Sequence, residues 1–220
     1  MAHPNRIRAN IICIVAACMA MVGYQIWVGN RRVQTETNRA QVEANLPKLT
    51  LAQISSLDRK AFERSLPQLQ QAVAQPGLKT VVSRETLAAI TAKLRQTDES
   101  TPDYWPATLR FIQFASSQMA PDAPPPGQQP RILSEILSRG LMRGIREEGI
   151  TIECDDGDLG NGEFTGCRII FTPNPVQLTN ATFRNCVFEI PITDNPNPYI
   201  KKVGRALLDS DLDSVSIPSL

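Results

Sequence analysis

The chain has 220 residues, of which 42% are hydrophobic, 5% are aromatic and 17 are prolines. This composition excludes a large enzyme domain and a wholly disordered chain, and it allows one or two modest folded units. The 23 basic and 22 acidic residues leave a formal net charge of +1. A balance this close to neutral excludes nucleic acid as a partner, because nucleic-acid-binding domains carry a basic surface.

The first predicted element is an apolar helix over residues 10–29. No charged residue occurs in this range, and a helix of roughly 20 residues rises about 30 Å, the thickness of a hydrocarbon core. Arginines flank the range on both sides, and Tyr24 and Trp27 occupy positions typical of interfacial aromatic residues. We therefore predict a single-pass transmembrane anchor in the lipid bilayer, preceded by a short tail over residues 1–9.

Two processing alternatives to a retained anchor stay open. A secretory signal peptide would be cleaved, although the apolar run continues past each candidate cleavage position. Residues 15–18 resemble the lipobox of bacterial lipoproteins, with lipidation at Cys18. The positive-inside rule compares Arg6 and Arg8 with four basic residues at positions 31, 32, 39 and 48. This count slightly favours a cytoplasmic body for the membrane protein, while the short arginine-containing tail allows the opposite orientation.

Residues 30–120 form a predicted helical region punctuated by prolines. Ser83 is a candidate N-cap for one of its helices, and another helix is expected after Pro106. Apolar residues recur at steps of three and four, which predicts amphipathic helices; these residues include Phe62, Leu66, Leu69, Val73, Leu87, Ile90 and Leu94. The pattern predicts a small bundle or a stalk, because the sustained heptads of a partner-binding coiled coil are missing from the sequence.

The region after residue 120 divides into three further segments before the end of the chain. Residues 121–130 contain five prolines and are predicted to be a linker. Residues 131–149 place apolar side chains on one helical face and end at a glycine, which predicts an amphipathic helix. Residues 150–192 form a predicted β-module, and residues 193–220 are predicted to be a C-terminal tail.

Within the β-module the sequence repeats itself with a constant spacing, so that position 178 corresponds to position 159 and later positions correspond in the same way. A fixed period of this kind indicates stacked coils, each of which buries its apolar side against the next. The predicted structural core of the repeat consists of Leu159, Phe164, Cys167, Ile169 and Phe171, matched by Leu178, Phe183, Cys186, Phe188 and Ile190.

The repeat has a finer period of five, and residues 157–190 resemble the pentapeptide-repeat family. Three pentapeptides and the short segment 172–175 together make up the offset of the repeat. The resemblance implies a right-handed quadrilateral β-helix in which the central residue of each pentapeptide points inward. It also implies that Phe164 lies over Phe183, and that Cys167 lies over Cys186. Only two coils are visible in the sequence, so a plain β-roll or meander is the alternative.

These elements together predict the α+β fold class. The expected chain has an N-terminal transmembrane helix, a helical stalk or small bundle, and a short C-terminal β-solenoid or β-roll flanked by the helix over 131–149.

We predict no catalytic, cofactor-binding or metal-binding residues, because the side chains that could carry chemistry do not form a recognisable site. Cys154, Cys167 and Cys186 lack the short spacing of zinc sites and are predicted to be small buried hydrophobes. The single histidine, His3, precedes the anchor, so the body has no histidine for a catalytic triad. The acidic clusters are interpreted as solvated turns; they consist of Asp155, Asp156 and Asp158, and of Asp209, Asp211 and Asp213.

The sequence favours a non-enzymatic, membrane-anchored interaction or scaffold protein that presents the β-module. The alternative is a sensor or regulatory accessory subunit of a membrane complex, in contact with another membrane or peripheral protein. An enzyme, ranked third, would depend on the first acidic cluster together with Glu163. The sequence sets no oligomeric state.

Overall fold

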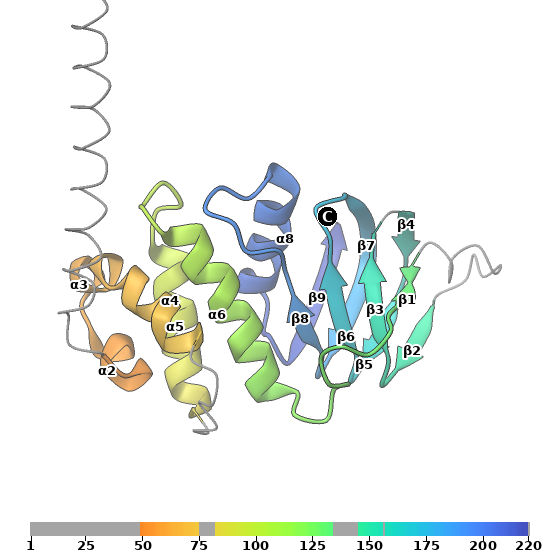
Figure 1. The fold of residues 1–220 in the computed structure, drawn as a ribbon, viewed down its shortest axis with the longest axis horizontal. Coiled ribbons are helices and arrows are strands. Elements are labelled where there is room, and N and C mark those ends of the chain that lie inside the picture. Colours follow the sequence, from red (N-terminus) through yellow and green to blue (C-terminus); the bar gives the residue numbers. More distant parts are fainter. Residues whose placement is uncertain (1–48, 75–81, 134–144, 156, 220) are drawn as a thin grey trace, which may run out of the picture. The chain divides into compact units, whose positions relative to one another are not determined.

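A computed structural model describes residues 49–74, 82–133, 145–155 and 157–219. They belong to one compact unit that spans Lys48–Leu220. In Figure 1, helices occupy one part of this unit and two sheets of mostly parallel strands occupy the other. The predicted anchor over residues 10–29 and the tail before it lie outside the described residues.

The predicted fold class is wrong. It included an N-terminal transmembrane helix, but within the described part of the chain no helix is both long and apolar enough to cross a membrane. That part is an α/β unit with six helices and two sheets. The helices do not form a separate stalk either, because buried residues of the helices and of the sheets belong to one hydrophobic core.

Three of the five helices before the sheets begin at side chains that accept hydrogen bonds from the first helical turn. Thr50 and Asp58 cap the first two helices, and Ser83, the cap expected from the sequence, accepts from the backbone N–H of Thr86. The five helices are α2 (Leu51–Ser56), α3 (Arg59–Arg64), α4 (Leu66–Ala74), α5 (Arg84–Gln96) and α6 (Tyr104–Met119). The apolar stripes of α4, α5 and α6 are buried, as the three- and four-residue spacing predicts.

Two cations on α5 bind the C-terminal ends of other helices. The ammonium group of Lys93 donates to the carbonyl oxygen of Leu57, the C-cap of α2. The guanidinium group of Arg95 donates from Nε to the carbonyl oxygen of Leu208 at 2.7 Å, and from Nη2 to that of Ser210 at 2.9 Å. Helix C-termini leave carbonyls unpaired and carry partial negative charge, so these cations complete two helix ends.

The two sheets are built from short strands that pair with partners far along the chain. The first sheet is parallel, in the order β1 (Arg131–Ile132), β3 (Thr151–Cys154), β6 (Arg168–Phe171) and β8 (Val187–Glu189). The second has the parallel order β2 (Arg146–Glu148), β5 (Glu163–Thr165), β7 (Val176–Arg184) and β4 (Gly157–Gly160), and β9 (Ser214–Ser219) pairs antiparallel with β7.

The strand registers define successive coils, which we call the coil stack (residues 146–190). Phe164 pairs with Phe183 and Ile169 with Phe188, so both pairs have the offset of the sequence repeat. Ile152 pairs with Ile169, and the offset of this pair is shorter by two positions. The sequence therefore contains an additional coil before the two that the repeat predicted.

The coils turn at residues with positive φ. Gly149, Gly166 and Asn185 follow β2, β5 and β7 with φ of 63°, 60° and 51°. At another corner, Asn161 and Asn180 have φ of 57° and 52°, and the side-chain amide of Asn180 donates to that of Asn161 at 3.3 Å. Glycine and asparagine adopt this left-handed conformation most easily, which explains their recurrence at equivalent corners.

Two predicted segments differ from the structure. The predicted helix over 131–149 has a strand at each end, β1 and β2, while residues 134–144 lie outside the described residues. These strands obtain their hydrogen bonds from neighbouring coils, a long-range pairing that local periodicity does not reveal. The predicted tail over 193–220 contains helix α8 (Pro198–Asp209) and strand β9.

Helix α6 and strand β9 close the last coil. The backbone N–H of Phe188 in β8 donates to Ser116 Oγ at 3.1 Å, and Gln113 Nε2 donates to the carbonyl oxygen of Ile190 at 2.8 Å. Helix α8 packs closely on α6, since a Cβ atom at Gly204 would lie 2.9 Å from Leu109 Cδ2. The helices thus protect an edge that would otherwise expose unpaired backbone groups.

Candidate functional site

The predicted core residues of the repeat lie inside the coil stack. Nine have at most 3% of their surface exposed; they are Phe164, Cys167, Ile169, Phe171, Leu178, Phe183, Cys186, Phe188 and Ile190. Leu159 pairs with Leu178 through the backbone of β4 and β7, and its side chain lies outside the described ones. These residues therefore build the scaffold rather than a reactive site.

Stacked aromatic rings hold adjacent coils together. The rings of Phe164 and Phe183 have centroids 5.0 Å apart and an interplanar angle of 12°. Phe188 meets Phe183 edge-on at 5.7 Å. Aromatic pairs at these separations add to the stabilisation from burial, so the coils form a rigid support for the side chains on their outer surface.

The three cysteines of the body are free and buried. Cys167 Sγ donates to the carbonyl oxygen of Glu147, and Cys186 Sγ donates to that of Phe164, both one coil away. Burial raises the pKa of Cys154 to about 12, and the side-chain hydrogen bond with Cys167, together with burial, raises the pKa of Cys186. Cys154 and Cys186 thus remain protonated near neutral pH and behave as small core side chains.

The Pro-rich segment over 121–130 covers part of the first sheet. The carbonyl oxygen of Pro124, a buried residue, accepts a hydrogen bond of 2.6 Å from Arg168 Nε. Arg168 also forms an ion pair with Glu189, and its side chain is only 11% exposed. The segment predicted as a linker is therefore fastened to β6 as it passes from α6 to β1 (Figure 1).

The second sheet presents an exposed polar surface, which we call the outer face. Its side chains alternate with buried ones along adjacent strands. Seven are exposed and Thr182 is half-buried; the outer face consists of Arg146, Glu148, Glu163, Thr165, Thr182, Arg184, Ser214 and Ser216. Arg146 and Glu163 form an ion pair across β2 and β5 at 3.1 Å. The face carries both signs of charge and several short hydroxyl side chains.

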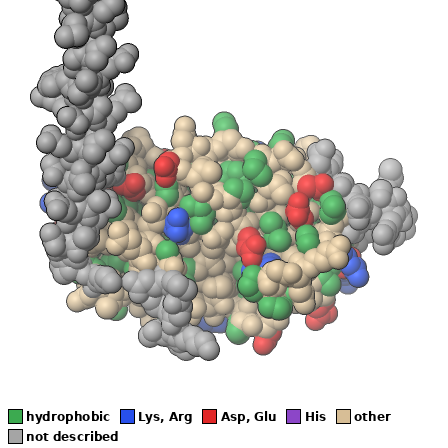
Figure 2. Space-filling model, viewed as in Figure 1, with side chains coloured by type: hydrophobic (Ala, Val, Ile, Leu, Met, Phe, Trp, Pro, Cys, Tyr) green, Lys and Arg blue, Asp and Glu red, His purple; other side chains and the backbone are tan. Residues whose placement is uncertain are grey.

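The view in Figure 2 shows hydrophobic, acidic and basic side chains in small groups among other polar atoms. Within the coloured part of this view, no single sign of charge covers a wide area. This mixed surface agrees with the nearly neutral composition of the chain.

The acidic residues singled out in the sequence are dispersed. Asp209 forms an ion pair with Arg205 at 3.2 Å, and Asp213 lies 3.5 Å from Arg84. Asp156 and the side chain of Asp158 lie outside the described part. Across the described ranges, no group of three or more histidine, cysteine, aspartate or glutamate side chains is placed to hold a metal ion.

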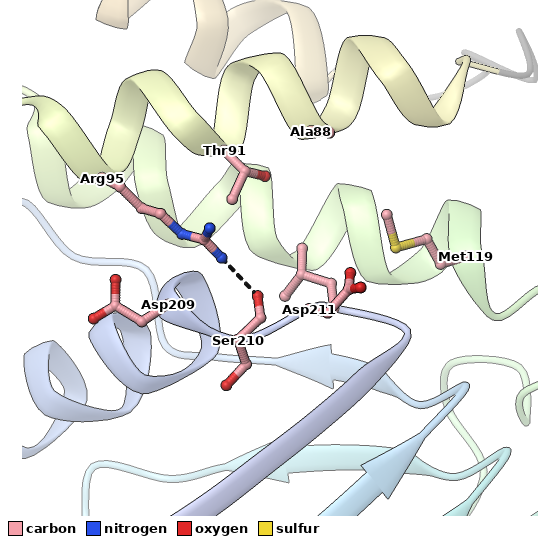
Figure 3. A pocket seen from close by; sticks show the side chains of 8 residues that line it. Ala88, Thr91, Arg95, Met119, Asp209, Ser210 and Asp211 are labelled. Atoms are coloured by element: carbon pink, nitrogen blue, oxygen red, sulfur yellow. Dashed lines mark hydrogen bonds between the residues drawn. The ribbon is translucent and has the colours of Figure 1, made fainter.

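The helical side of the unit contains a hollow of about 340 Å³ between α5, the end of α6 and the turn that joins α8 to β9. Figure 3 shows Arg95 reaching across it to Ser210. Its lining consists of Ala88, Thr91, Arg95, Met119, Asp209, Ser210, Asp211 and Leu212. Sequence reasoning missed this pocket because it forms where α5 meets residues more than 110 positions later.

Comparisons with protein-family models, curated proteins and solved structures found no match to the chain. The resemblance to the pentapeptide-repeat family therefore rests on residues 157–190 alone.

Proposed function

We propose that the chain is a non-enzymatic interaction module that binds a partner protein through the outer face. The observation that carries this proposal is the row of exposed polar side chains on β2, β5, β7 and β9, held by a rigid coil stack. Helix α6 covers the edge of the last coil, and the Pro-rich segment is bound to β6 on the first sheet. The outer face therefore remains as the surface of the coil stack through which a partner binds.

The geometry of the outer face suits protein binding. Its strands are hydrogen-bonded to neighbours in the sheet, so little backbone entropy is lost when a partner binds. The face combines arginine and glutamate with threonine and serine, which resembles the polar rim of an interface more than its apolar centre. This composition favours a reversible complex over a permanent one.

The proposal is tested with a photo-crosslinking amino acid placed at single positions of the full-length chain in its native host. Thr165 and Ser216 lie on the outer face, and exposed Gln96 on α5 is the matched control. We expect the two outer-face positions to crosslink to the same partner protein and the α5 position not to do so.

A second arm asks whether the captured protein recognises the outer face. Replacing Arg184 with Glu should reduce crosslinking from Thr165 at least tenfold while leaving the unfolding temperature close to that of the wild type. Equal crosslinking from all three positions, or none from the outer face, would contradict the proposal.

A further inference from the structure

The hollow between α5, α6 and the α8–β9 turn is open to solvent and large enough to admit a small molecule. Its volume of about 340 Å³ is at the low end of the range for ligand pockets. Ala88, Met119 and Leu212 give it apolar walls, and Thr91 and Ser210 line it with hydroxyl groups that donate to the carbonyl oxygens of Leu87 and Ala206. The pocket shares no residue with the outer face and is independent of the proposed function.

Arg95 brings a fixed positive charge to the pocket. Its Nε and Nη2 atoms bind the carbonyl oxygens of Leu208 and Ser210, which hold the guanidinium group in place. Nη1 and the second hydrogen of Nη2 remain as donors, because a guanidinium group has five N–H bonds. Among the ion pairs formed by the described residues, none includes Arg95.

The opposite charge comes from the turn between α8 and β9. Asp209 is already paired with Arg205 at 3.2 Å. Asp211 is exposed at the pocket wall and, within the described ranges, forms no ion pair. Figure 3 shows Arg95 and Asp211 on separate sides of the Ser210 backbone. The pocket thus presents a cation and an anion that do not neutralise each other directly.

We propose that this pocket binds a small zwitterion of the α-amino-acid class. The ligand carboxylate accepts hydrogen bonds from Nη1 and Nη2 of Arg95, in the end-on bidentate geometry that guanidinium groups favour. The ligand ammonium group lies next to Asp211, and its side chain contacts the apolar wall. An anion without an ammonium group is repelled by Asp211, and a simple cation is repelled by Arg95, so the lining selects for both charges together.

Calorimetric titration and amide NMR shifts of the full-length chain test this assignment. The probes are glycine, L-alanine, L-serine and L-leucine, with acetate and methylammonium as single-charge controls. We expect at least one amino acid to bind with saturable shifts at Thr91 and Leu212, and at least tenfold more tightly than acetate or methylammonium.

Two variants probe the two charges separately. Replacing Asp211 with Asn should weaken binding of the amino acid at least tenfold, and Arg95→Lys should weaken it while retaining the positive charge. Asp194→Asn, at an exposed residue outside the pocket lining, is the control and should bind like the wild type. The proposal is overturned if no amino acid gives saturable shifts up to roughly 50 mM, a concentration far above millimolar affinity. Binding of acetate as tight as that of the amino acids, or unchanged binding by Asp211→Asn, would also overturn it.

Discussion

Truncation of Phe183 to alanine is expected to destabilise the helices as well as the coil stack. The side chain is 1% exposed, stacks on Phe164 at 5.0 Å and meets Phe188 edge-on at 5.7 Å. Removal of a buried phenylalanine typically costs about 3–5 kcal/mol, and each aromatic pair contributes about 0.5–1.5 kcal/mol beyond burial. Because the measured cost of such truncations already includes the lost ring contacts, we expect the free energy of unfolding to fall by about 4 kcal/mol.

The assay follows this loss from a distant reporter. Trp105 lies on α6 with 7% exposure, and the sequence has only one other tryptophan, Trp27. In a Trp27→Phe background, urea unfolding is followed by fluorescence of Trp105 and by far-ultraviolet circular dichroism. Because α6 and the sheets share one core, Phe183→Ala should move both transitions to lower urea by the same amount.

Thr182→Ala is the matched control for this experiment. Thr182 is the chain neighbour of Phe183 on the same strand but belongs to the outer face, so its truncation should change stability by less than about 0.5 kcal/mol. An unchanged Trp105 transition in Phe183→Ala would instead show that the helices fold independently of the coil stack. A loss below about 1 kcal/mol would refute the tight stacking of the rings.

Three further predictions concern a corner, an edge and a buried thiol. Gly166→Ala should lower the free energy of unfolding, measured by chemical denaturation, by about 1–2 kcal/mol, because alanine disfavours the φ of 60° at this corner. An added Cβ would meet nothing within 4 Å, so no steric clash contributes. Gly166→Asn should cost less than half as much. Ser116→Ala leaves the N–H of Phe188 without its acceptor and should lower the free energy of unfolding by about 1–3 kcal/mol. Exposed Ser117→Ala is the control and should change stability by less than about 0.5 kcal/mol. A similar loss in both variants would argue against a stabilising role for the hydrogen bond between Ser116 and β8. Burial raises the pKa of Cys154 to about 12, so above pH of about 8.5 the unfolded thiol loses a proton that the folded thiol keeps, and stability falls as pH rises. Urea unfolding at pH 7 and pH 10 should therefore show a drop roughly 2 kcal/mol larger in the wild type than in Cys154→Ala, and equal drops would contradict this origin.

The sequence predicted those parts of the fold that depend on repeated or local patterns. The offset of the repeat places Phe164 opposite Phe183, as the strand register has it. The sequence does not reveal the preceding coil, because its offset is two positions shorter and because a charged residue, Glu147, pairs with Phe164. A change in period together with a polar substitution removes the signal on which repeat detection depends.

Helix α8 shows a different kind of failure. Asn197 caps it, Pro198 begins it, and its buried residues follow helical spacing, so its signals were present in a segment that we interpreted as a tail. At the two ends of the segment 131–149, positions that also fit helical spacing form the strands β1 and β2. The local sequence pattern decides neither case, because packing against distant parts of the chain determines whether a segment becomes a helix or a strand.

The two coil offsets also show where the coil stack tolerates extra chain. The connection from β3 to β4 consists of positions 155 and 156 alone, whereas the equivalent connection from β6 to β7 runs over 172–175. The extra residues that lengthen the second offset thus all lie in this one connection. The strand pairs on either side of it, β3 with β6 and β4 with β7, stay in register. Residues 173–175 are exposed, so this corner is a place where evolution or protein engineering can graft a loop onto the stack while every inward-facing side chain stays in line.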